Sequence, residues 1–151
     1  MDDNQRVLRI IHGHREISKA FYGLLSKAAH RHGITPVQLV VLSKLAEHPN
    51  TRLSDLSERM NLGNSTMSGI IDRMVKADLV SRERTEADRR AITLSLTTKG
   101  AELRKATEVT KMQQLRPLLE LSEHDQREWL RIQQDMIHIL KDQQRKEDLH
   151  G

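Results

Sequence analysis

Cysteine is absent from the 151-residue chain, and aromatic residues are scarce. Without a thiol the chain has no disulfide, cysteine nucleophile, thiol-based oxidant sensor or thiolate metal ligand. One Trp, one Tyr and one Phe leave Leu, Ile, Val, Met and Ala to build the core. No apolar run approaches the roughly 18 residues of a membrane span, and the first residues do not resemble a signal peptide. We therefore expect one cytoplasmic domain with no membrane partner.

Motifs that carry catalysis or metal binding are also missing. The sequence shows no glycine-rich phosphate loop, no His-Glu metal motif and no convincing carboxylate pair. The histidines occur two apart, as His12 with His14 and His30 with His32. Residues two apart on a helix point about 200° away from each other, so neither pair can chelate an ion without further ligands. We expect no catalytic site, no cofactor and no metal site.

The hydrophobic pattern predicts a long helix at each end of the chain. Apolar residues from Val7 to Ala28, and again from Trp129 to Leu140, recur at steps of three and four. This spacing places them in one stripe on a helix. A small domain has little left to cover two such stripes, so contact with a second copy of the chain is the simplest solution. A self-contained helical core is the alternative.

Three further helices are predicted between residues 35 and 77. Thr35 and Gln38 have the spacing of a capping box around a first-turn proline. Ser54 is expected to cap a short helix, and Asn64 or Ser65 is expected to cap the next one. The last two helices, with the turn between them, outline a helix-turn-helix.

A hairpin is predicted directly after these helices. Residues 79–82 and 91–96 alternate between apolar and polar types, as half-buried strands do, and the polar residues 83–90 form the loop. Beyond the hairpin, Thr97 or Thr98 is expected to cap a helix. Pro117 should interrupt that helix, and Ser122 should cap the last one.

The helix predicted from residue 65 to 77 has two different faces. One carries Met67, Ile70, Ile71, Met74 and Val75; the other carries Ser65, Thr66, Ser68, Gly69, Asp72, Arg73 and Lys76. Short hydroxyl side chains allow close approach to a major groove, and Arg reaches a guanine edge or a phosphate. A glycine inside a helix costs about 1 kcal/mol relative to Ala, so Gly69 indicates close approach of DNA or of a neighbouring helix. An ordinary solvated helix face is the alternative.

Arginines are concentrated around the predicted hairpin loop, at positions 82, 84, 89 and 90. The negative potential of a narrow minor groove attracts inserted guanidinium groups. Asp88 either pairs with one of these arginines and fixes the loop or acts as a turn former. The formal net charge of +4 favours a polyanionic partner.

Three segments together resemble the MarR family of bacterial regulators. They read LSDLSERMNL at 53–62, STMSGIIDRM at 65–74 and DRRAITLSLT at 88–97, with Lys99 and Gly100 following. The resemblance extends over nearly the whole chain, because residues 35–38 and the flanking long helices match the family's layout.

This resemblance implies a mainly α-helical fold with a small β-hairpin. A winged helix-turn-helix at 34–100 would lie between dimerisation helices at 1–33 and 101–151. The resemblance assigns Ser65, Thr66, Ser68, Gly69 and Arg73 to the recognition helix, and Asp88 and Arg90 to the wing, with Arg90 entering the minor groove. Arg84 and Arg89 are added to the wing from their charge and position.

The implied function is sequence-specific binding of double-stranded DNA by a transcriptional regulator, a repressor. A homodimer would read a pseudo-palindromic operator with half-sites roughly 10 bp apart. The resemblance also implies release by a small-molecule effector, bound between the dimerisation helices and the DNA-binding lobe, but the sequence identifies neither that molecule nor its site. The alternative is a winged-helix module that binds another protein and no specific DNA. An enzyme is a third class, for which the sequence offers no motif.

Overall fold

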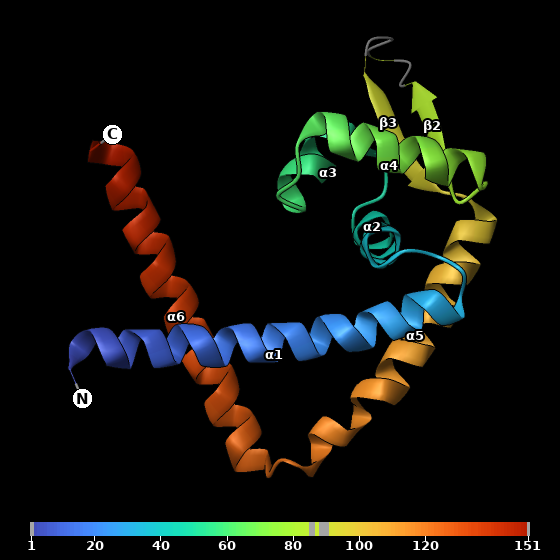
Figure 1. Ribbon diagram of the computed structural model, residues 1–151. Coiled ribbons are helices and arrows are strands. Elements are labelled where there is room, and N and C mark those ends of the chain that lie inside the picture. The colour runs from blue at the N-terminus through green and yellow to red at the C-terminus, as the bar shows by residue number, and fades with distance from the viewer. Residues whose placement is uncertain (1, 85–86, 88–90, 151) are drawn as a thin grey trace. The chain divides into compact units, whose positions relative to one another are not determined.

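The computed structural model describes residues 2–84, 87 and 91–150 and is mainly α-helical with a small antiparallel sheet, as predicted (Figure 1). It divides into two units, Met1–Gln114 and Leu115–Gly151. The elements run in the order α1 (Asp3–Arg31), α2 (Pro36–Glu47), β1 (Thr51–Arg52), α3 (Leu53–Arg59), α4 (Asn64–Lys76), β2 (Val80–Arg84), β3 (Ile92–Leu96), α5 (Thr98–Leu115), the 3-10 helix η1 (Arg116–Glu120) and α6 (Glu123–His150). The predicted functional boundaries after residues 33 and 100 stay predictions, because the two units are defined by contacts alone.

Three helices of the first unit end in the same way. Gly33 after α1, Asn61 after α3 and Asp78 after α4 have positive φ angles of 70°, 52° and 57°. In each case the amide of the following residue donates to the carbonyl five positions before it, at 2.9 to 3.1 Å. This Schellman arrangement satisfies carbonyls that a helix end leaves unpaired. Each helix therefore stops sharply, and the chain can turn at once into the next element.

The helix starts were predicted with mixed success. The capping box before α2 is confirmed, since Gln38 N donates to Thr35 Oγ1 at 3.2 Å and Thr35 N donates to Gln38 Oε1 at 3.1 Å. The predicted caps of the next two helices are wrong. Helix α3 follows Arg52 and α4 follows Gly63, and neither has a side-chain cap. Arg52 belongs to β1, whose extended backbone already has the conformation that a cap position requires.

The sheet has the strand order β1-β3-β2, with both pairings antiparallel. Strand β2 extends to Arg84 rather than to residue 82, because pairing with β3 continues to Arg84 opposite Ile92. The two-residue β1 was not predicted, since a strand this short shows no alternation. It pairs Thr51 with Leu94 and Arg52 with Thr93, so β3 is the central strand and β2 lies at an edge.

The core of the first unit lies between these elements. Its fully buried side chains come from α2, α3, α4, β2 and β3; the largest are Leu42, Leu45, Leu56, Met67, Ile71, Met74 and Leu94. Burial of a Leu, Ile or Met side chain contributes roughly 1.5 to 3 kcal/mol relative to exposure. Aliphatic side chains and methionine therefore form the core, as the scarcity of aromatic residues requires.

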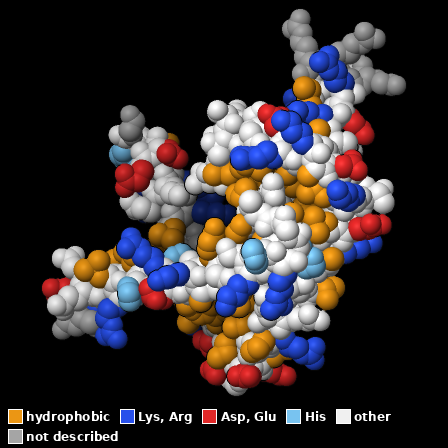
Figure 2. All heavy atoms as spheres, turned by 45° about the vertical axis from the view of Figure 1, so that its right-hand side comes forward, with side chains coloured by type: hydrophobic (Ala, Val, Ile, Leu, Met, Phe, Trp, Pro, Cys, Tyr) orange, Lys and Arg blue, Asp and Glu red, His pale blue; other side chains and the backbone are white. Residues whose placement is uncertain are grey.

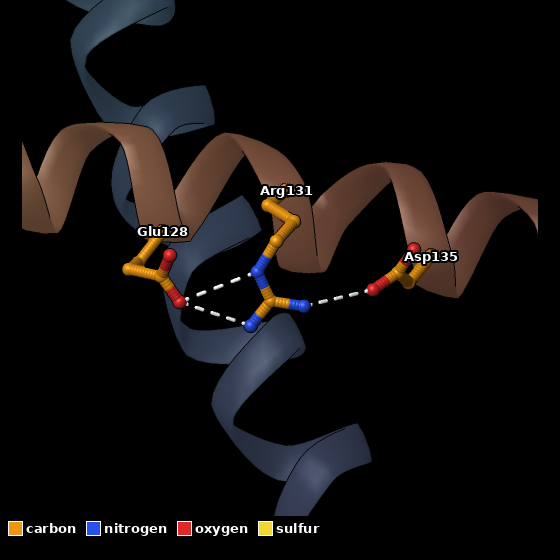
Figure 3. A network of polar contacts seen from close by, with 3 residues as sticks. All are labelled: Glu128, Arg131 and Asp135. Carbon is orange, nitrogen blue, oxygen red and sulfur yellow. Dashed lines mark hydrogen bonds and ion pairs between the residues drawn. The ribbon is translucent and has the colours of Figure 1, made fainter.

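The second unit consists of η1 and α6. The chain leaves α-helical geometry at η1, which contains Pro117, and Asp125 N then donates to Ser122 Oγ at 3.1 Å. Both features were predicted. On α6 the Arg131 guanidinium donates to Glu128 and Asp135, one helical turn away on either side (Figure 3). The hydrogen bonds and the charge of Glu128 raise the pKa of Arg131 above its usual value.

Among the described residues, none of the helices combines the length and the apolar composition that a membrane span requires.

Hydrogen bonds of Thr97 link the end of α4 to the start of α5. Thr97 N donates to the Leu79 carbonyl at 3.2 Å, and Thr97 Oγ1 donates to the Asp78 carbonyl at 2.6 Å. The same hydroxyl accepts a hydrogen bond from Gly100 N at 3.0 Å and thereby caps α5. Gly100 is buried so close to Leu79 that a Cβ atom would overlap the Leu79 carbonyl oxygen. Glycine is therefore required here by space.

We expect Gly100→Ala to lower the free energy of unfolding by about 1 to 3 kcal/mol, because the backbone at Leu79 must move to admit a methyl group. Chemical denaturation followed by circular dichroism measures the change. Gly69→Ala is the matched control, since a Cβ at Gly69 would lie 3.9 Å from the end of the Arg73 side chain and Ala is favoured in a helix by about 1 kcal/mol. Equal stability of the wild type and Gly100→Ala would contradict the steric explanation.

Candidate nucleic-acid interface

The buried face of α4 fixes this helix against the core. Met67, Ile71 and Met74 are fully buried and Ile70 nearly so, as their spacing predicts. Their side chains pack with residues of α2, α3 and the hairpin strands. Because one face is held in this way, the orientation of the opposite face is determined as well.

The opposite face of α4 is small, polar and accessible. Ser65, Thr66 and Arg73 are exposed, whereas Ser68 and Gly69 are half-buried. Arg73 lies back along the helix, where its Nε donates to the Gly69 carbonyl at 3.2 Å. All five residues proposed for the recognition helix therefore lie on one accessible surface. Their contact with DNA stays a prediction.

Gly69 lies in this surface without a packing reason inside the chain. Apart from α4's own backbone, a Cβ at this position would come within 4 Å of the Arg73 side chain alone among the described residues. The described structure therefore gives no support to the alternative that a neighbouring helix approaches Gly69. Because Gly69 has no side chain, an external molecule can approach the α4 backbone closely at this position.

The first turn of α4 presents backbone donors to the surface. Gly63 precedes the helix, and no side chain accepts hydrogen bonds from the first amides. Such amides and the positive end of the helix dipole attract anions such as phosphate. The uncapped start, which the sequence did not predict, is therefore compatible with a negatively charged partner.

Strand β2 carries arginines on the side that faces α4. Side chains two apart lie on the same face of a strand, so Arg82 and Arg84 share a face with the buried Val80. The guanidinium of Arg82 reaches the carboxylate of Asp72 on α4 and forms an ion pair with it. Arg84 is exposed two residues further along the strand. The hairpin and the polar face of α4 therefore meet along one side of the unit.

The remaining predicted wing residues, Asp88, Arg89 and Arg90, lie outside the described residues. The face shown in Figure 2 carries Lys and Arg side chains, with Asp and Glu side chains between them. Within residues 2–84, 87 and 91–150, no group of three or more His, Asp or Glu side chains is placed to hold a metal ion.

Comparison with known proteins identifies the family of the chain. Residues 34–92 match the model of the MarR family. The HTH-type transcriptional repressor MdtR of Bacillus subtilis is 39% identical over 70 residues, 46% of this chain and 45% of MdtR. The organic hydroperoxide resistance transcriptional regulator of the same organism is 32% identical over 102 residues, which span 68% of this chain and 67% of that protein. The chain belongs to the MarR family.

The fold of the MarR family is found over almost the entire chain. A MarR structure from Staphylococcus aureus superposes with a TM-score of 0.78 at 23% sequence identity, covering 91% of this chain and 94% of that one. The winged helix-turn-helix inferred from the sequence is therefore confirmed as the fold.

The ion pair between Asp72 and Arg82 was found only in the structure. Asp72 and Arg82 are ten positions apart and belong to different elements, so no helix or strand period relates them. The sequence placed Arg82 among the arginines around the hairpin loop, but gave no sign of its partner. The sequence placed Asp72 on the polar face of α4 without a role.

Proposed function

We propose that the protein is a transcriptional regulator that binds a specific sequence of double-stranded DNA. The single observation that carries this proposal is the connection between the accessible polar face of α4 and the arginine-bearing face of β2 through Asp72 and Arg82. A major groove admits an α-helix, and a neighbouring minor groove attracts arginine. A surface that presents a slim helix and an arginine-bearing hairpin side by side suits two adjacent grooves.

The recognition-helix residues and the wing arginines would contact different parts of the DNA. Hydroxyl groups of Ser65, Thr66 and Ser68 and the guanidinium of Arg73 are suited to base edges. Arg84, Arg89 and Arg90 are suited to phosphates and the minor groove. Asp88 would hold an arginine of the loop. Arg73 would leave the Gly69 carbonyl when it reaches a base.

Selection of DNA fragments by the purified protein should yield a shared pseudo-palindromic sequence. Arg73→Ala is expected to weaken binding to that sequence by about 1 to 3 kcal/mol and to relax the preference at one base position. Arg90→Ala should weaken binding to all sequences equally and reduce its salt dependence. Gel shifts over a salt series measure both effects. Arg127→Ala on α6 is the control for the loss of one positive charge. If no selected sequence binds better than random DNA at physiological salt, and a pull-down instead recovers a partner protein, the protein-binding module is the correct function.

Gly69→Ala should weaken binding to the selected DNA although it stabilises the fold. A methyl group there meets little inside the chain, but it would hold the DNA away from the half-buried centre of the α4 surface. We expect roughly a tenfold loss, the size of one poorly accommodated contact. Fluorescence anisotropy measures the affinity. Unchanged affinity would show that DNA does not approach α4 at this position.

The protein is further proposed to act as a homodimer. Helix α1 exposes a stripe of large apolar side chains, Val7, Ile10, Ile11, Ile17 and Phe21; helix α6 exposes another, Trp129, Ile132, Ile139 and Leu140. Apolar faces of this extent on two long helices are typical of a protein–protein interface. A second copy of the chain would cover them and give the two-fold symmetry that a pseudo-palindrome requires.

Ile139→Asp is expected to shift the protein from dimer to monomer, because a carboxylate would be buried in the contact between copies. Analytical ultracentrifugation over a concentration series measures the association. Gln134→Asp introduces the same side chain on the opposite side of α6 and should leave the dimer intact. A wild-type protein that stays monomeric at micromolar concentration would overturn the proposed assembly.

Repression with release by a small molecule is the form of regulation that the relatives support. MdtR is named a transcriptional repressor, and the Staphylococcus aureus MarR structure is a complex with salicylate and kanamycin. We carry both properties to this chain as part of the proposal, with the effector left open. Salicylate is the first compound to test for release of bound DNA.

A further inference from the structure

Asp72 is an acidic residue in the middle of a surface proposed to meet a polyanion. It follows Ser65, Ser68 and Gly69 at helical steps of three and four, so it shares their side of α4. Its side chain is 51% exposed. An unpaired carboxylate at this position would repel phosphates and weaken binding. Its presence therefore requires a compensating role.

The ion pair between Asp72 and Arg82 differs in kind from the others that the structure shows. Pairs such as Asp3 with Arg6 and Glu128 with Arg131 link residues three or four apart in one helix. The Asp72–Arg82 pair links a helix to a strand. Pairing within a helix supports local structure, whereas a pair between elements restricts how they move relative to each other.

Strand β2 pairs with β3 along one side only. The central strand β3 is paired with β1 as far as Arg52 opposite Thr93. On the other side β2 is an edge strand, and its residues after Ser81 are exposed. Arg82 pairs in the sheet with the buried Leu94, and its guanidinium reaches Asp72 on α4. The ion pair therefore acts where the hairpin begins to leave the core.

We propose that Asp72 is a positioning residue that holds the hairpin against α4 through Arg82, so that both meet DNA in a fixed relative orientation. This inference rests on the proposed DNA-binding function. The carboxylate is neutralised by Arg82 and contacts no base. The alternative role is direct recognition, because an aspartate can accept a hydrogen bond from the amino group of cytosine.

A double-mutant cycle separates these roles. Asp72→Asn, Arg82→Gln and the double variant are titrated with the selected DNA and with single-base variants of it. We expect Asp72→Asn to weaken binding about fivefold, the upper range for an exposed ion pair, and to have no further effect when Arg82→Gln is present. Arg82→Lys keeps the charge and should retain more affinity than Arg82→Gln. Asp135→Asn on α6 also removes one carboxylate from an arginine and should change nothing.

Hydrogen exchange of the free protein provides a readout that needs no DNA. Asp72→Asn and Arg82→Gln should speed exchange of the β2 amides while the amides of α2 keep their protection, and Arg82→Lys should restore part of the slow exchange. Hydrogen exchange tests the positioning role even if the wild-type protein prefers no DNA sequence. That result would contradict the proposed function but not the contact between Asp72 and Arg82.

Three results would overturn the inference: β2 exchange that Asp72→Asn leaves unchanged, DNA binding that Asp72→Asn strengthens, or an effect of Asp72→Asn on DNA binding that persists in the Arg82→Gln background. An effect that persists and is confined to one base pair would assign Asp72 to direct recognition instead.

Discussion

The backbone contact between Leu79 and Gly100 is the constraint on which the geometry of the surface depends. This contact brings the first turn of α5 directly against Leu79, which joins the end of α4 to the start of β2. Since Thr97 also donates to the carbonyls of Leu79 and Asp78, both ends of the hairpin meet at this point. A hairpin whose base is fixed at α4 keeps its position relative to that helix.

Opposite requirements are met on the two sides of α4. Inside, Met67, Ile71 and Met74 need dense packing, which fixes the helix. On the outer side, short side chains and Gly69 leave the helix backbone accessible. These residues have a lower helix propensity than Ala, and packing of the inner face must offset that loss of stability. A sequence chosen for stability alone would place alanine at Gly69. Such a conflict between local helix preference and the residue present is typical of functional surfaces, and it agrees with the proposed role of this face in DNA binding.

Local signals explain what the sequence could predict. The capping box at Thr35, the cap that Ser122 provides for α6 and the position of strand β3 depend on neighbours a few residues away, and all three were predicted. The burial along β3 does not follow the predicted alternation, since Thr93 and Leu94 are both buried. The strand β1, the fit of Gly100 against Leu79 and the pair of Asp72 with Arg82 depend on residues brought together by folding. Periodicity carries no information about such contacts. The residues of the α4 surface were predictable because a helical period separates the faces, but their partners were not.

Fixing both ends of the hairpin has a consequence for how the surface can diversify. The segment between β2 and β3 begins and ends on strands whose base is held by Leu79 and Thr97. Changes of its length or composition would therefore add little closure entropy and would leave the packing of the core intact. Substitutions in this segment could therefore change the chemistry that the hairpin presents without disturbing the helices that support it.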